Sequence, residues 1–166
     1  MTSERDTFIN NRLMSLRIFC GSLISALVIF AVVAVVALGL EDYPSPLVAG
    51  GLFLLNLLAF GVAELVGYKV APIAAGTPPD EALRRGLDAL QQTTTLRFAL
   101  TEAPGILALM GAFVTGSAWV YLVGGFWTLL STFWHVWPSR RIATKLERNL
   151  DSEGGRSGLS QVFVSG

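Results

Sequence analysis

The chain has 166 residues, of which 52% are hydrophobic and only 14% carry a charged side chain. Its mean hydropathy of +0.58 lies far above that of a soluble domain, so composition excludes an ordinary water-soluble globule. Twelve Lys and Arg residues balance twelve Asp and Glu residues, which argues against binding to nucleic acid. With one cysteine, Cys20, and one histidine, His135, we expect no disulfide framework, no metal site and no cofactor within one chain.

Two long apolar runs in the first half predict two membrane-spanning helices. Residues 18–40 are 23 residues without a charge, which as a helix extend about 34 Å and can cross the hydrocarbon core. A signal peptide is the alternative, but the run exceeds the apolar core of a typical one, so we expect an uncleaved helix. After the turn at residues 41–46, a second run covers residues 47–68 and tolerates Asn56 and Glu64 if they face other helices.

The second half contains two further apolar runs, residues 98–114 and residues 118–137, separated by only three residues. A single helix over residues 98–137 would extend about 60 Å, roughly twice the thickness of the hydrocarbon core. We therefore predict two antiparallel helices joined by a tight turn. The fold class expected is all-α, an integral membrane four-helix bundle with a cytoplasmic amphipathic helix.

The positions of the basic residues predict the orientation of these spans. All twelve Lys and Arg residues lie before residue 18, between residues 69 and 97, or after residue 138. The two predicted outer loops, residues 41–46 and 115–117, contain none. The positive-inside rule then places both termini in the cytoplasm and indicates four crossings of a bacterial plasma membrane, the cell inner membrane.

The predicted cytoplasmic segments contain two amphipathic stretches and a polar tail. Residues 78–97 begin with a proline-rich helix start and predict a helix on the inner face, with its continuity into the third span left open. Residues 138–150 predict a basic amphipathic helix at anionic lipid headgroups, or a solvated stub that stops the last span from slipping outward. Residues 151–166, rich in Gly and Ser, predict disorder. The candidate headgroup residues are Arg140, Arg141, Lys145 and Arg148.

Three titratable residues form a candidate proton or ion site, because Glu64, Glu102 and His135 fall at a similar depth, about 6 Å inside the inner boundary. Intramembrane ionisable groups normally pair with one another or face a wet cavity. The alternative interpretation is structural: Glu102 is favoured at a helix start after Thr101, Glu64 pairs with Lys69, and His135 is an interfacial residue. Both interpretations remain open.

Small residues at four-residue intervals predict close helix packing in the second and third spans. Such stripes let two backbones approach, either within one bundle or between copies in a homo-oligomer. The candidate packing residues are Ala59, Ala63, Gly67, Ala108, Ala112 and Gly116.

A family resemblance lies in residues 100–106, together with Tyr121 and residues 137–141. The acidic Thr-Glu-Ala-Pro start of the third span resembles that of a group of uncharacterised bacterial four-span membrane proteins. Glu102 beside small residues is also similar to the proton-carrying helix of the rotor subunit of rotary ATP synthases, which implies Glu102 as a proton site. That subunit is a two-helix hairpin with its acid near mid-membrane, whereas Glu102 is shallow, so its function is not carried over.

These features predict a non-enzymatic accessory or structural subunit of a membrane complex. Its expected partners are the lipid bilayer and another membrane protein or a second copy. The alternative is a small proton-linked transporter or channel that uses Glu64 and Glu102. We expect no enzymatic activity, because the available Ser, Thr, His and Glu residues have no spacing typical of a catalytic set.

Overall fold

The computed structural model describes residues 2–163, and these form five α-helices and one short 3-10 helix, with no strand among them. Helix accounts for 78% of the protein, so the all-α prediction is confirmed. The elements are α1 (Thr2–Leu38), α2 (Pro46–Val66), α3 (Pro79–Thr115), α4 (Ala118–Val136), α5 (Arg140–Leu150) and η1 (Gln161–Phe163).

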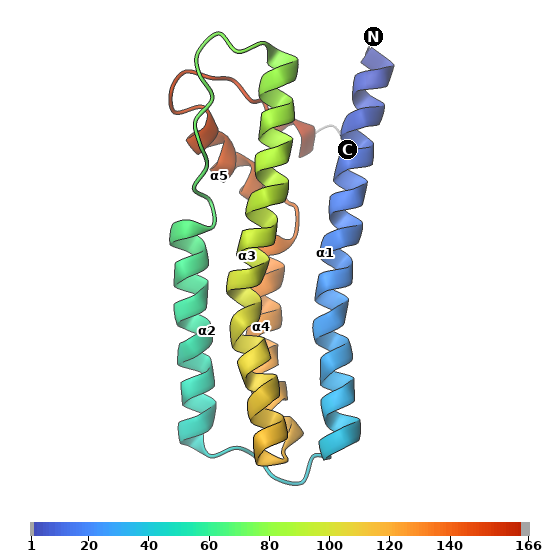
Figure 1. Ribbon diagram of the computed structural model, residues 1–166, viewed down its shortest axis with the longest axis vertical. Coiled ribbons are helices and arrows are strands. Elements are labelled where there is room, and N and C mark those ends of the chain that lie inside the picture. The colour runs from blue at the N-terminus through green and yellow to red at the C-terminus, as the bar shows by residue number, and fades with distance from the viewer. Residues whose placement is uncertain (1, 164–166) are drawn as a thin grey trace.

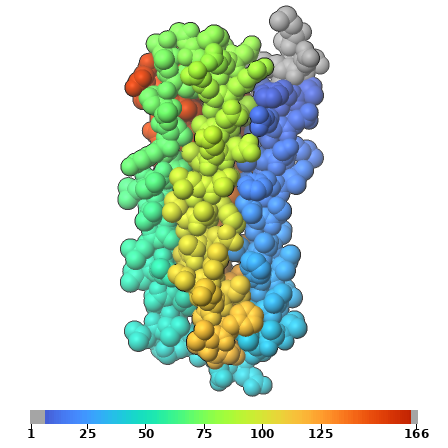
Figure 2. All heavy atoms as spheres, viewed as in Figure 1, coloured from blue at the N-terminus to red at the C-terminus, as the bar shows by residue number. Residues whose placement is uncertain are grey.

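The four long helices run side by side along the longest axis of the molecule (Figure 1). α5 lies at one end, beside the start of α3, and we call this the α5 end. The short links at residues 39–45 and 116–117 lie at the opposite end, which we call the loop end. In Figure 2, α3 occupies the middle of the visible face, with α1 on one side and α2 on the other.

Three helical segments are long and apolar enough to cross a membrane: Thr7–Leu38, Pro46–Val66 and Pro79–Thr115. Their outward faces expose large apolar side chains such as Val36, Leu47 and Val114, which are 81%, 85% and 86% exposed. Water is a poor solvent for so continuous an apolar surface, and lipid is a good one. The structure therefore fits a membrane protein.

α4 was predicted as the fourth span but does not belong to that group of three. Its 19 residues include Thr128, Ser131, Thr132 and His135, and all four are buried against the other helices. These polar residues lower the mean hydropathy of α4 without facing its surroundings.

The predicted amphipathic helix and the third predicted span, whose continuity the sequence left open, form one helix, α3. The helix is unbroken over 37 residues, passes through Pro104, and ends at Gly116 in the left-handed conformation with φ +72°. Its first half extends the line of the third predicted span, instead of lying flat on an inner membrane face (Figure 1). The apolar residues of that half are buried in protein, which explains the difference: Ala82, Leu83, Leu87 and Leu90.

The apolar face of α5 also packs against protein, while the predicted contact of its basic residues with lipid headgroups stays a prediction. Its four buried residues join the core cluster that includes the first half of α3 and are at most 2% exposed. The basic residues Arg140, Arg141 and Arg148 remain exposed on the other face. The buried residues are Ile142, Ala143, Leu146 and Leu150.

Residues 151–163 do not form the disordered tail predicted from their Gly and Ser content. Leu159 is fully buried in the α3–α5 core. The Ser160 amide donates to the Glu147 carboxylate over 3.2 Å, and Gly154 forms an isolated β-bridge with Ala74. A few buried contacts thus offset the entropy of ordering a polar segment. Residues 164–166 of the predicted tail lie outside the described residues.

We predict that Leu159→Ala lowers the free energy of unfolding by about 2–5 kcal/mol, because the substitution leaves a cavity in a packed core. Chemical unfolding of the detergent-solubilised protein, followed by circular dichroism, measures this change. Leu107→Ala is the matched control, because Leu107 is 52% exposed. Equal effects of the two substitutions would contradict the packed position of the tail.

Candidate functional site

The buried face of α4 carries polar side chains that hydrogen-bond to α2. The Thr128 hydroxyl donates to the side-chain oxygen of Asn56 over 2.9 Å, and the Asn56 amide donates to the Gly124 carbonyl over 3.3 Å. Asn56 is only 4% exposed. A buried amide with both of its ends bonded holds two helices in one register, since any shift would leave a polar group without a partner.

The same face of α4 also bonds to α3 and α1. The Thr132 hydroxyl donates to the Thr101 hydroxyl over 3.1 Å. The Tyr121 hydroxyl donates to the Leu27 carbonyl of α1 over 2.8 Å. α4 is therefore connected by side-chain hydrogen bonds to each of the other three long helices.

His135 continues this polar face at the α5 end and is fully buried. Its Nδ1 lies 3.0 Å from the Tyr68 hydroxyl, within hydrogen-bond distance, and 3.7 Å from a carboxylate oxygen of Glu64. The Phe60 ring covers the imidazole, with 4.5 Å between ring centroids. Among the contacts of the described residues, Nε2 has no hydrogen-bond partner. The structure thus brings together two of the three predicted site residues, Glu64 and His135.

Glu64 also forms an ion pair with Lys145 of α5, so that its carboxylate joins α2, α4 and α5. The structural interpretation of the sequence paired Glu64 with Lys69 instead. Lys145 lies 81 residues away in the chain, and no periodicity in a sequence signals such a contact. The Lys145 ammonium also lies 4.0 Å from the centroid of the Tyr68 ring.

Glu102 lies apart from this pair. No hydrogen bond or ion pair joins it to Glu64 or His135 in the part of the chain that the structure describes. Its neighbour Thr101 faces Thr132, which precedes His135 by about one helical turn. Glu102 therefore sits nearer the loop end than the other two predicted site residues, on a different helix face from Thr101.

Arg97 is a site residue that the sequence did not single out. Its side chain is fully buried, and the guanidinium lies over the Tyr68 ring at 4.6 Å. It donates to the Gly67 carbonyl over 3.3 Å, to the Thr93 hydroxyl over 3.3 Å and to the Thr94 hydroxyl over 2.9 Å. The two threonines, three and four residues earlier on the same helix face, were the only local signal for this position.

The small residues of α2 allow the close approach of Arg97. Ala63 is fully buried, and Ala59 is partly buried. A Cβ atom added at Gly67 would lie 2.5 Å from Cγ of Arg97 and 2.5 Å from the Ala63 carbonyl oxygen. The α2 stripe therefore packs inside this molecule, around a buried cation.

The small residues of α3 serve two purposes. Ala108 and Ala112 are fully buried, and a Cβ atom added at Gly124 of α4 would lie 2.5 Å from Cβ of Ala108. Gly116 does not pack; it ends α3 in the left-handed conformation and starts the turn into α4. The hairpin of α3 and α4 thus depends on close backbone contact along its length and on a glycine at its turn.

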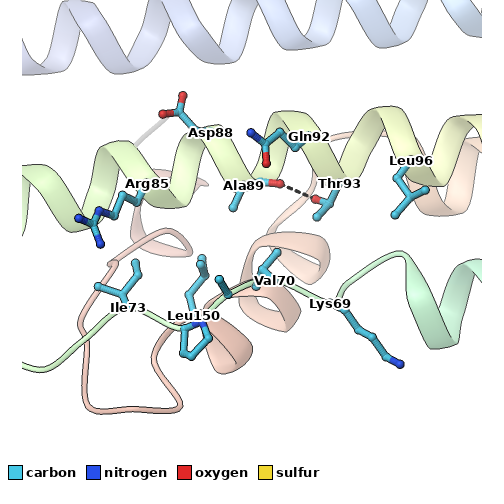
Figure 3. A pocket seen from close by; sticks show the side chains of 12 residues that line it. Lys69, Val70, Ile73, Arg85, Asp88, Ala89, Gln92, Thr93, Leu96 and Leu150 are labelled. Atoms are coloured by element: carbon cyan, nitrogen blue, oxygen red, sulfur yellow. Dashed lines mark hydrogen bonds between the residues drawn. The ribbon is translucent and has the colours of Figure 1, made fainter.

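A hollow of about 490 Å³ lies between the link at residues 69–73 and the first half of α3 (Figure 3). Lys69 and Arg85 extend from opposite ends of this hollow, and Asp88 points away from the link. Arg85 is paired with Glu81 over 2.6 Å and Asp88 with Arg12 over 3.6 Å. Because Arg85 and Asp88 are compensated by neighbours and Lys69 is the one further charge in the lining, the hollow presents no concentrated charge to a ligand.

Comparisons with protein-family models, with curated proteins and with solved structures give no match for this chain. The similarity of residues 100–106 to bacterial four-span proteins therefore stays a prediction.

We predict that Gly67→Ala destabilises the protein by about 1–3 kcal/mol, because the added methyl group overlaps Arg97 and the Ala63 carbonyl. Gly61→Ala in α2, the helix that Gly67 caps, is the matched control, since nothing lies within 4 Å of the Cβ added there. Thermal unfolding in detergent compares the two variants. A loss of stability in Gly61→Ala as large as that in Gly67→Ala would contradict the close contact.

Proposed function

We propose that this protein is a four-span membrane protein that acts as a non-enzymatic accessory or structural subunit of a membrane complex. The assignment of α4 as the fourth crossing is supported by its antiparallel course beside α3 and by Phe126, Leu130 and Phe133, which are exposed on its outward face. Both termini are assigned to the cytoplasm of a bacterial plasma membrane, because the loop end carries no Lys or Arg residue.

The single observation that supports a structural role is that polar side chains between the helices form hydrogen bonds with groups on neighbouring helices. Two side-chain hydrogen bonds cross between helices: Thr128 donates to Asn56, and Thr132 donates to Thr101. The Tyr121 hydroxyl donates to the backbone of α1. Side chains that are satisfied in this way stabilise one arrangement of helices. A scaffold that presents fixed outer faces to neighbours benefits from such rigidity.

The orientation is tested with two single-cysteine variants, Glu41→Cys at the loop end and Glu153→Cys at the α5 end, both made in a Cys20→Ala background. Both glutamates are exposed. We expect a membrane-impermeant thiol reagent to label Glu41→Cys in intact cells and Glu153→Cys only after the membrane is opened. Labelling of Glu153→Cys in intact cells would contradict the proposed topology.

The accessory role predicts a stoichiometric partner after extraction from native membranes with a mild detergent. Light scattering combined with refractive-index and absorbance detection gives the protein mass of the complex. We expect a mass well above the 17.8 kDa of one chain, with a second protein band or a second copy accounting for the difference. A lone monomer would contradict the proposal.

A proton-linked transporter is a second candidate function, favoured by the contact of His135 with both Tyr68 and Glu64. Both groups face the same ring nitrogen, Nδ1, which can take a proton from one of them and give it to the other. Proton flux into reconstituted vesicles, measured from about pH 5 to 8, tests this function. The transport hypothesis predicts a flux that Glu64→Gln abolishes and that the matched variant Glu102→Gln retains, whereas the accessory role predicts no flux in the wild type.

A further inference from the structure

A groove of about 500 Å³ runs along the outer surface between α2 and α4. The rings of Phe53 and Trp127 meet edge to face in it, with centroids 5.0 Å apart. Leu57, Leu130 and Trp134 line the groove and are 53%, 49% and 52% exposed, so its walls are apolar and open to the surroundings. A groove of this kind on a surface that faces lipid accommodates an acyl chain.

A second hollow, of about 610 Å³, opens between α5 and the end of α2. It is lined by four cations and one carboxylate, and that carboxylate, Glu64, is already paired with Lys145. The other three cations make no ion pair with a carboxylate among the described residues, so this hollow carries an uncompensated positive charge. These three are Arg140, Arg141 and Arg148.

The groove and the hollow are neighbours at Trp134. Trp134 lines the groove, while Arg141, which lines the hollow, stacks over the Trp134 ring at 4.2 Å and donates to the Trp134 carbonyl. On α2, Phe60 lines the groove, and Glu64, about one helical turn further on, lines the hollow. The end of the apolar groove therefore lies beside a cluster of arginines.

We infer that this surface binds one anionic phospholipid, with an acyl chain in the α2–α4 groove and the phosphate headgroup among Arg140, Arg141 and Arg148. Guanidinium groups form paired hydrogen bonds with phosphate oxygens, and a tryptophan at the boundary is typical of the membrane interface. A headgroup of net negative charge compensates the arginines, whereas a zwitterionic one does not. The inference rests on the proposed placement of the α5 end at a membrane surface.

The test is lipid binding to the purified, delipidated full-length protein in detergent, measured by native mass spectrometry. Phosphatidylglycerol and phosphatidylcholine with identical acyl chains are the two probes. We expect phosphatidylglycerol to bind at one molecule per chain and at least about tenfold more tightly than phosphatidylcholine. Equal affinities would overturn the inference, and the cysteine-labelling result reports on the topology separately.

Two sets of variants assign the binding to this surface. The triple variant Arg140→Gln, Arg141→Gln and Arg148→Gln is expected to weaken phosphatidylglycerol binding by about tenfold or more. The matched control, which removes the same charge from other exposed positions, is Arg17→Gln, Arg84→Gln and Arg156→Gln, and it should bind as the wild type does. An equal loss in both triple variants would overturn the site in favour of general charge attraction.

The acyl groove is tested separately with Leu130→Trp, which fills it, and with inorganic phosphate as a headgroup without a chain. We expect Leu130→Trp to weaken phosphatidylglycerol binding and inorganic phosphate to compete poorly. Full competition by inorganic phosphate, with no effect of Leu130→Trp, would identify a site for free phosphate and overturn the lipid assignment. Unfolding curves of each variant confirm that a loss of binding does not reflect a loss of fold.

Discussion

The arrangement of the long helices depends on the hydrogen bonds that leave the buried face of α4. In a bilayer, lipid is as apolar as the helices, so the hydrophobic effect does not bring them together, and close packing with polar contacts takes its place. α4 supplies both kinds of contact. Gly124 lets α4 approach Ala108 of α3, while Thr128 bonds to Asn56 of α2 and Tyr121 to the backbone of α1. The helix whose buried face is rich in polar side chains is thus the one that the other three share.

At the α5 end, the hydrophobic effect stabilises the packing. There, an apolar core joins the first half of α3, α5 and the segment around Leu159. Buried charges and polar groups mark the junction of the two regions. Arg97 and His135 are both fully buried there and both contact Tyr68, and Glu64 joins Lys145 of α5 to the same cluster. The cluster holds α5 against the ends of α2 and α4. It therefore also fixes where the basic residues on the outer face of α5 lie. A lipid bound between α2 and α5 would therefore act on the packing of the whole bundle.

The sequence predicted the long helices because apolar runs and tight links are local signals. It could not predict what covers α5, because a four-residue apolar period indicates a buried face but not whether lipid or protein buries it. The Glu64–Lys145 pair joins residues 81 positions apart, and the contact of Arg97 with the Gly67 carbonyl spans 30. Depth estimated from helix ends put Glu102 at a level similar to that of Glu64 and left open whether the two face each other, because the helix face toward which a side chain points depends on packing that no single run encodes. Of the three residues that the sequence grouped by depth, the structure therefore brings together only Glu64 and His135, and their role as a proton or ion site stays a prediction.

The most direct test of the role of α4 is a double-mutant cycle on Asn56→Ala and Thr128→Ala, with unfolding measured in mixed micelles of detergent and lipid. The account predicts a coupling energy of about 0.5–1.5 kcal/mol, because each substitution removes the same interhelical hydrogen bond. Asn56→Ala combined with Thr95→Ala is the control and should be additive, since Thr95 is exposed and bonds within its own helix. Strict additivity of Asn56→Ala and Thr128→Ala would contradict the central place of α4 in the fold.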